Sequence, residues 1–231
     1  MAAGKFGVGG PKLATFVRDR TRSSALIYVE TLGGYGMSHA PSGPNALVVE
    51  ALQTGGCVLV MRHASAPMSR PERRAAEADN ASCERQLDDS GKACVRAMGQ
   101  SIRQLRIRLD EVFSSPTYRA RETVRLAGLV EPRIITQLDE RTTGNADSAW
   151  LRAKIVQPPQ PGTNVLIVTH MPNILDSLDG TLSDIAPGEA LVFRPEGASP
   201  VELLARIRIE CWSLLAQSVR QPPSRVVNGD P

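Results

Sequence analysis

Two histidines and two arginines of this 231-residue chain stand where they could do chemistry together. Arg62 and His63 directly follow one short apolar run. His170 directly follows a second such run, and Arg119 comes shortly after a third. Because the chain has only three histidines, the placement of two of them after its two most strand-like runs indicates a shared role.

The chemistry that suits this set is phosphoryl transfer. A neutral imidazole can accept a phosphoryl group covalently, which splits one difficult displacement into two easier ones. Guanidinium groups bind phosphate oxygens bidentately and stay charged, so Arg62 and Arg119 could hold the group and stabilise its transition state. A cationic set of this kind can replace a metal ion. Taken singly, His63 or His170 is also explained as a structural residue at a strand end.

Apolar runs and apolar periods alternate along the chain, which predicts strands alternating with helices. Residues 57–61 and 164–169 are apolar on both faces, as in strands buried between two helix layers. Asn45, Asp88 and the pair Ser115–Pro116 are expected to begin helices. The helix after Asp88 has one apolar stripe that recurs every three to four residues: Cys94, Met98, Ile102, Leu105 and Leu109.

The expected strands cover residues 57–61, 111–114, 134–135, 164–169, 190–193 and 201–209. The expected helices cover residues 45–52, 89–109, 116–129, 146–156 and 210–219. This order predicts a three-layer αβα sandwich with a mainly parallel central sheet and an antiparallel return near the C-terminus. Ligands bind such sheets outside the carboxyl ends of the strands, where helix N-termini favour anions. His63, Arg119 and His170 are all expected at that edge.

Three segments of the chain carry a resemblance to a known family. They are Val-Met-Arg-His-Ala at 60–64, Phe-Ser-Ser-Pro-Thr-Tyr-Arg-Ala-Arg-Glu-Thr at 113–123, and Val-Leu-Ile-Val-Thr-His at 165–170. In sequence, order and spacing they resemble the successive motifs of the histidine phosphatase superfamily, the phosphoglycerate mutase-like proteins. The resemblance covers about residues 55 to 215.

The resemblance implies that His63 is the phosphorylated nucleophile and that Arg62, Arg119 and His170 bind the phosphate. It implies no metal and no cofactor. Glu140 stands where many members carry the general acid that protonates the leaving oxygen and later activates water. The alternative for Glu140 is a solvated loop carboxylate.

The sequence departs from the family pattern at several positions. Ala64 replaces the commoner glycine, and Ala66 stands where many relatives have a hydroxyl near the phosphate. After Glu140, the usual glycine and acidic residue are kept only in part, within residues 144–147. Arg85 precedes the long helix where relatives often place a polar residue facing the site, so it is either a substrate contact or a surface arginine.

Composition narrows the class of protein. The chain is 42% hydrophobic and 22% charged, as in a globular domain, and no apolar run is long enough to span a bilayer. Its net charge of +3 is spread over several segments, which argues against a nucleic-acid partner and suits an anionic substrate or a solvated surface equally. Four cysteines without CxxC spacing predict free thiols rather than a zinc site: Cys57, Cys83, Cys94 and Cys211.

We expect three parts: an N-terminal extension at 1–45, a catalytic domain at 46–220 and a C-terminal tail at 221–231. The extension is rich in Gly, Ser, Pro and Arg and has no sustained period, which is typical of a flexible segment. Its best apolar stretch, residues 25–29, is short and precedes Glu30, so a cytoplasmic location is expected. Export would require a mis-assigned start or a degraded signal.

The predicted function is metal-independent hydrolysis of a phosphomonoester through a phosphohistidine on His63. The substrate is a phosphorylated small molecule or a phosphoprotein; the sequence does not identify it or the oligomeric state. The short stretch between Arg119 and His170 favours a hydrolase over a mutase. A protein phosphohistidine phosphatase, and a catalytically weak phosphate-binding or regulatory protein of the same fold, remain alternatives. The loops that would select the substrate carry Arg70, Arg73, Arg74 and Arg152, which could bind acidic groups or face water.

Overall fold

The computed structural model describes residues 17–19, 44–67, 84–140, 145–178, 182–195 and 201–220. The strands are β1 (Val17–Asp19), β2 (Val58–Arg62), β3 (Leu109–Ser114), β4 (Arg133–Ile134), β5 (Asn164–Thr169), β6 (Ala190–Arg194) and β7 (Val201–Ile207). The helices are α1 (Pro44–Thr54), α2 (Asp89–Gln104), α3 (Tyr118–Ala127), the short 3-10 helix η4 (Thr136–Leu138), α4 (Asn145–Ile155), α5 (Met171–Ser177) and α6 (Cys211–Arg220).

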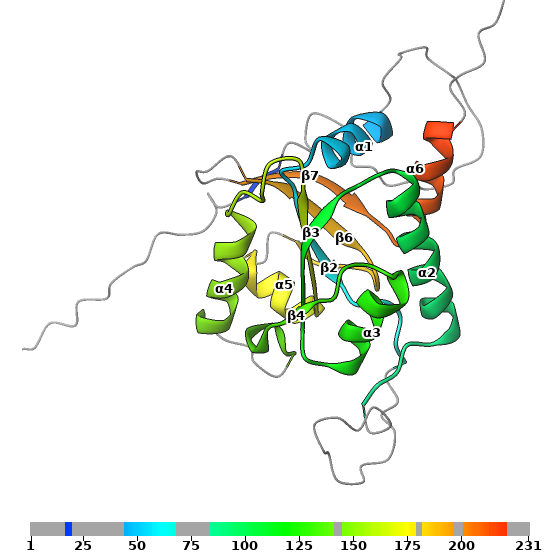
Figure 1. Ribbon diagram of the computed structural model, residues 1–231. Helices are drawn as coiled ribbons and strands as arrows, with labels where there is room; N and C mark the ends of the chain where they lie inside the picture. The colour runs from blue at the N-terminus through cyan, green and yellow to red at the C-terminus, as the bar shows by residue number, and fades with distance from the viewer. Residues whose placement is uncertain are drawn as a thin grey trace, which may run out of the picture.

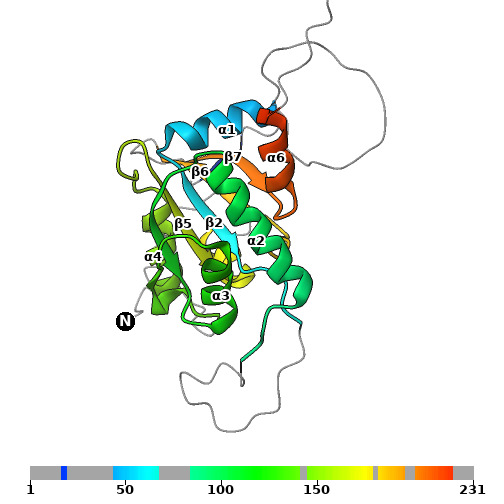
Figure 2. The same cartoon turned by 45° about the vertical axis from the view of Figure 1, so that its right-hand side comes forward.

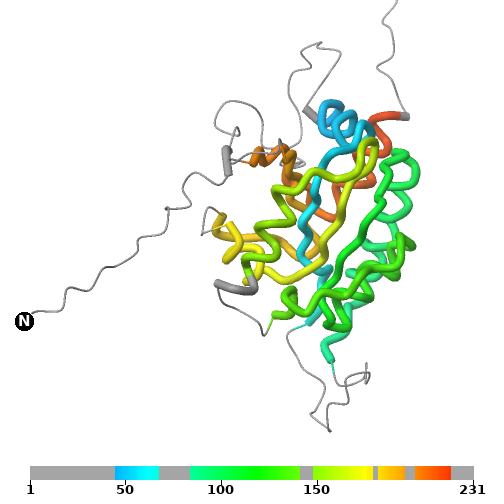
Figure 3. The backbone as a smooth tube through the Cα atoms, turned by 60° about the vertical axis from the view of Figure 1, so that its left-hand side comes forward, coloured from blue at the N-terminus to red at the C-terminus, as the bar shows by residue number. Residues whose placement is uncertain are grey.

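The strands form one mixed sheet in the order β1-β7-β6-β2-β5-β3-β4 (Figure 1). Strands β2, β5, β3 and β4 are mutually parallel, whereas β6 runs antiparallel to both β2 and β7. Figure 3 shows β2, β5 and β3 side by side in the middle of the molecule. The predicted mainly parallel sheet with an antiparallel return is confirmed.

Alternate residues of the strands enter two separate cores, one on each face of the sheet. Leu59 and Met61 of β2 share a core with apolar residues of α1, α2, α3 and α6. Val58 and Val60 of the same strand share a second core with residues of α4 and α5. Figure 2 shows the layers, with α1, α2 and α6 on one side of the sheet and α4 on the other. The predicted three-layer αβα architecture is therefore confirmed.

Leu109 was assigned to a helix by its spacing, and this prediction is wrong. Helix α2 ends at Gln104, and the chain turns at Arg106, which has a left-handed φ of 56°. Leu105 is buried at the helix end, and Leu109 opens β3 and packs against the same core. The apolar period continues past the helix because the helix end and the following strand face one core.

Two predicted helix starts are also wrong. Asn45 lies inside α1, which begins at Pro44. Helix α3 begins at Tyr118 with Thr117 as its extended N-cap residue, not at Ser115. The Ser115 backbone N–H donates to the Val168 carbonyl at 2.9 Å, so this residue continues the pairing of β3 with β5.

Several predictions lie wholly or partly outside the described residues. They concern the bulk of the extension at 1–45, the tail at 221–231, Arg70, Arg73, Arg74, Cys83 and the residues directly after Glu140. Three described residues of the extension form β1, which pairs in parallel with β7. Cys57, Cys94 and Cys211 are free thiols. Within the described ranges, no helix combines the length and the apolar character that crossing a membrane requires.

Candidate active site

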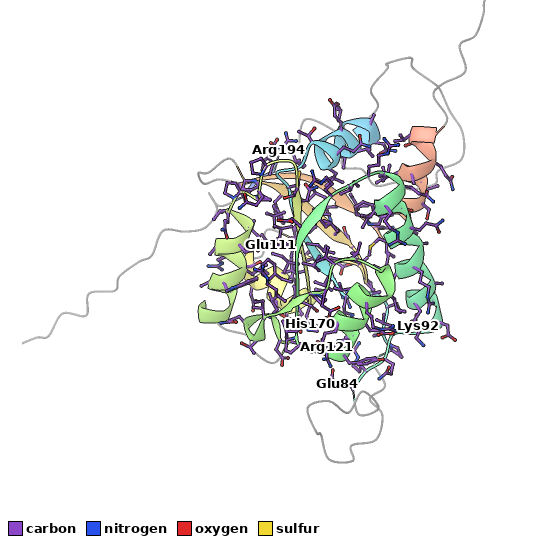
Figure 4. All side chains as sticks on the ribbon, viewed as in Figure 1. Glu84, Lys92, Glu111, Arg121, His170 and Arg194 are labelled. Carbon is purple, nitrogen blue, oxygen red and sulfur yellow. The ribbon has the colours of Figure 1, made fainter. Side chains whose placement is uncertain are left out.

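The ends of three parallel strands bring the predicted site residues to one edge of the sheet. Arg62 pairs in register with Thr169, so the next residues, His63 and His170, leave neighbouring strands at the same level. The His63 backbone N–H donates to the Thr169 carbonyl at 2.9 Å. Ser115 follows β3 at the same level. In Figure 4, His170 lies at the end of the sheet opposite to Arg194.

Arg119, from the first turn of α3, joins the other side chains. Its Nε donates to His63 Nε2 at 3.2 Å, and its Nη2 contacts His170 Nδ1 at 3.2 Å. The same Nη2 donates to the carboxylate of Glu140. The two imidazole centroids are 5.2 Å apart. The side chains of His63, Glu140 and His170 therefore all contact Arg119, although no local sequence pattern links them.

Arg62 flanks this group from β2. Its Nη1 donates to the Ile185 carbonyl at 2.6 Å and lies 3.8 Å from the sulfur of Met171. Its Nε is buried and has no hydrogen-bond partner in the part of the chain that the structure describes. We refer to Arg62, His63, Arg119 and His170 as the His–Arg cluster.

The hydrogen bonds fix the tautomer of each imidazole. His63 Nδ1 lies 2.8 Å from the Ala64 carbonyl, which can only accept, so Nδ1 carries the proton and Nε2 carries a lone pair. Arg119 can only donate, so His170 Nδ1 also carries a lone pair. The Nε2–H of His170 then faces Ser115 Oγ at 2.9 Å.

Burial keeps both rings neutral. It lowers the pKa of His63 to about 3, and the charges of Arg119, Arg62 and Arg85 act in the same direction. Burial and the charge of Arg119 lower the pKa of His170 to about 2. Burial also lowers the pKa of the Arg62 and Arg119 guanidinium groups. The cluster thus presents a neutral imidazole nitrogen beside fixed cations, which suits attack on a bound anion.

Residues 58–160 match the family described as the histidine phosphatase superfamily, branch 1. The matched segment contains the first two of the three motifs on which the resemblance rests. The predicted resemblance is therefore confirmed. No curated protein matches the chain.

Several solved phosphatase structures are similar to this chain. The SixA protein of Agrobacterium tumefaciens is 18% identical with a TM-score of 0.49, over 66% of this chain and 97% of its own. The protein histidine phosphatase SixA in complex with tungstate is 17% identical with a TM-score of 0.46, over 66% and 97%. A phosphoserine phosphatase of Entamoeba histolytica is 14% identical with a TM-score of 0.44, over 63% and 94%.

The start of α2 fixes the loop that follows His63. Asp88 caps the helix through the Gly91 N–H at 2.6 Å, as predicted, and also accepts from Ser65 Oγ at 2.6 Å. The Ala64 N–H donates to Thr123 Oγ1 of α3 at 3.2 Å. Because Ala64 also accepts from His63, these bonds set the ring orientation.

Arg85 and Ala66 meet in the same loop. The Arg85 guanidinium donates to the Ala66 carbonyl at 2.8 Å and to the Pro67 carbonyl at 2.9 Å. Arg85 is half-buried, and its charge lowers the pKa of His63. Arg85 therefore orders the loop and adds to the positive field of the cluster, a role that neither interpretation from sequence included.

Sequence reasoning missed three polar residues around the cluster. Ser115 and Thr117 lie within 3.3 Å of His170 Nε2. Glu84 accepts a hydrogen bond from the Tyr118 N–H at the start of α3. Ser115 and Thr117 could have been found from the sequence, because they lie in the second motif between β3 and Arg119. No sequence pattern pointed to Glu84.

Arg152 of α4 bonds to the end of α5. Its Nε donates to the Ser177 carbonyl at 3.1 Å and its Nη2 to the Asp176 carbonyl at 2.6 Å, at the end of α5. These two bonds join α4 to α5. Among the described residues, no group of three or more His, Cys, Asp or Glu side chains could hold a metal ion.

Proposed function

We propose that this protein hydrolyses a phosphomonoester through a phosphohistidine intermediate on His63. The observation that carries the proposal is the state of that ring. Its Nδ1 proton is engaged by the Ala64 carbonyl, and its Nε2 lone pair faces the Arg119 guanidinium at 3.2 Å. A phosphoryl group bound to Arg119 would lie in front of this nitrogen.

In the first step, Arg119 turns its donors to the phosphoryl oxygens, the freed Nε2 lone pair of His63 attacks phosphorus, and the bond from phosphorus to the leaving oxygen breaks. Arg62 and Arg119 hold the equatorial oxygens and stabilise their charge. Burial and the charge of Arg119 depress the pKa of His170, and the charge of a bound dianion would act in the opposite direction. Glu140, protonated in the substrate complex, gives its proton to the leaving oxygen.

In the second step, Glu140 acts as a carboxylate and removes a proton from water. The water oxygen attacks phosphorus, the bond to His63 Nε2 breaks, and inorganic phosphate is released. Contact of Glu140 with Arg119 supports this assignment, because it places the carboxylate beside the guanidinium that would bind the phosphoryl group. The side chain is 37% exposed, which gives water access to it.

The proposed substrate is a phosphorylated small molecule or a phosphoprotein, and the proposed mechanism uses no metal ion. The two guanidinium groups of Arg62 and Arg119 can supply the positive charge that a metal supplies elsewhere. The match to the superfamily supports a phosphatase in general, and the geometry of the His–Arg cluster supports this mechanism.

The first test is hydrolysis of a generic aryl phosphate with excess EDTA, comparing the wild-type protein with His63→Ala. We expect turnover that resists EDTA and falls at least about 1,000-fold in the variant, since the covalent route is lost. Rapid quenching of the wild-type reaction should trap a phosphoryl group that is stable to base and labile to acid.

A His63→Ala variant that keeps full turnover would refute the nucleophile. Turnover lost in EDTA and restored by a divalent cation would refute the metal-independent mechanism. If neither protein turns over any phosphoester while inorganic phosphate still raises the melting temperature, the chain is a phosphate-binding protein of the same fold.

A further inference from the structure

The carboxylate of Glu140 depends on a short backbone segment for its position. We refer to Leu138, Asp139 and Glu140 as the acid segment. It begins with the last residue of η4, and residues 141–144 after it lie outside the described part of the chain. The Glu140 side chain meets Arg119, so a small shift of this backbone would move the carboxylate relative to the His–Arg cluster.

Two buried side chains that flank His170 hold the acid segment by its carbonyl groups. Thr169 Oγ1 donates to the Leu138 carbonyl at 2.9 Å. Asn173 Nδ2, from α5, donates to the Asp139 carbonyl at 3.1 Å. Thr169 is fully buried and Asn173 is 5% exposed, so water does not compete freely for either bond.

Because peptide groups are planar, these two hydrogen bonds also restrict the position of the Glu140 side chain. The carbonyl of Asp139 lies in one plane with the nitrogen and Cα of Glu140, so a bond to that oxygen fixes where the Glu140 side chain starts. The bond from Thr169 fixes the preceding plane in the same way. With both planes fixed, the acid segment cannot rotate about the Asp139 dihedral angles without breaking a buried hydrogen bond.

Stability alone does not account for the amide at position 173. Its Oδ1 is buried and has no hydrogen-bond partner among the described residues, which is costly for a polar atom. A leucine of similar size would avoid the unpaired oxygen and would suit the apolar core around α5. What a leucine could not do is donate to Asp139.

We propose that Asn173, assisted by Thr169, is a positioning residue that sets the Glu140 carboxylate against the His–Arg cluster. The segment that supplies His170 would then also locate the general acid, which keeps the two groups in a fixed relation. This inference rests on the proposed role of Glu140 as the acid.

The test is the dependence of kcat/KM on the leaving group. A series of aryl phosphates, from 4-nitrophenyl to phenyl phosphate, needs more help from the acid as the phenol becomes less acidic. We expect Asn173→Leu to lose about 10-fold to 100-fold on phenyl phosphate and much less on 4-nitrophenyl phosphate. Glu140→Gln should steepen the same dependence further.

Three further proteins separate positioning from a general loss of structure. Asn173→Leu/Glu140→Gln should match Glu140→Gln alone, because position 173 acts only through the acid. Ser177→Ala is the control: Ser177 is also buried on α5, but its Oγ donates to the Ile174 carbonyl of its own helix. Its dependence should equal the wild type. Thr169→Val should steepen the dependence of kcat/KM on the leaving group, as Asn173→Leu does. It replaces Asn173→Leu in the test if that variant melts below the assay temperature.

If Glu140→Gln steepens the dependence and Asn173→Leu does not, positioning by Asn173 is refuted while the acid role stands. If Glu140→Gln leaves the dependence unchanged, the acid role and the positioning role both fail. Neither result bears on the proposed phosphohistidine at His63, which the comparison with His63→Ala tests separately.

Discussion

At the scale of single residues, Arg119 is the side chain on which the site converges. Its Nε bonds to His63 and its Nη2 to His170 and Glu140, so one planar guanidinium aligns the proposed nucleophile, second imidazole and acid. Lysine would keep the charge but lose this fork. We therefore expect Arg119→Lys to lower kcat/KM for an aryl phosphate about 100-fold, as for the loss of one transition-state donor.

The melting temperature of Arg119→Lys should stay near that of the wild type, because the charge is kept. Arg125→Lys is the matched control in the same helix, since Arg125 pairs with Glu122 and does not touch the His–Arg cluster. A loss of activity in Arg125→Lys equal to that in Arg119→Lys would contradict the assignment.

At the scale of elements, the close packing of α2 against α3 supports the helix that carries Arg119. A Cβ added at Gly99 of α2 would lie 1.9 Å from the carbonyl oxygen of Ala127, the last residue of α3. This backbone atom also accepts from Arg103 Nη1 at 2.8 Å, so it is not free to move. We expect Gly99→Ala to destabilise the protein by about 2 kcal/mol or more, despite the better helix propensity of alanine.

Urea unfolding measures this effect. Gln100→Ala is the control, because Gln100 is the exposed neighbour in the same helix, and its stability should stay within about 0.5 kcal/mol of the wild type. A Gly99→Ala protein as stable as Gln100→Ala would show that the two helices can separate without cost.

At the scale of the whole molecule, the buried histidines make stability depend on pH. Unfolded, each ring binds a proton near pH 6.5, but folded His63 does so only near pH 3 and folded His170 near pH 2. Between these values the unfolded chain binds more protons, so stability falls as the pH falls below about 6.5. The expected loss between pH 7 and pH 5 is about 2 kcal/mol for each histidine.

Unfolding in urea at pH 7, 6 and 5 checks this expectation. A His63→Gln or His170→Gln protein should lose less stability over this range than the wild type, whatever its stability at pH 7. The depressed pKa values of Asp88 and Glu122 act only at lower pH, because their ordinary values are 3.8 and 4.5. Stability that is flat between pH 7 and pH 5 would mean that the folded rings take up protons freely.

The sequence by itself determined most of the sheet and the members of the proposed site. Residues 164–169 formed β5 as predicted, because an apolar, β-branched run buried on both faces has few other structures open to it. Arg62, His63, Arg119, Glu140 and His170 could be selected because strand ends and motif spacing are local properties. Two local patterns gave wrong predictions. The apolar period assigned Leu109 to a helix, but it begins β3. The capping signal assigned Ser115 to a helix start, but its N–H bonds to β5.

Only the tertiary structure decided how these residues meet. It placed Arg119 between the imidazoles, gave the proton of His63 to Nδ1, and buried both rings deeply enough to keep them neutral. It turned Arg152 to the end of α5 and brought Asn173 to the acid segment. Each of these facts rests on a contact between residues far apart in the chain, and such contacts depend on the packing of whole elements, which no local pattern encodes.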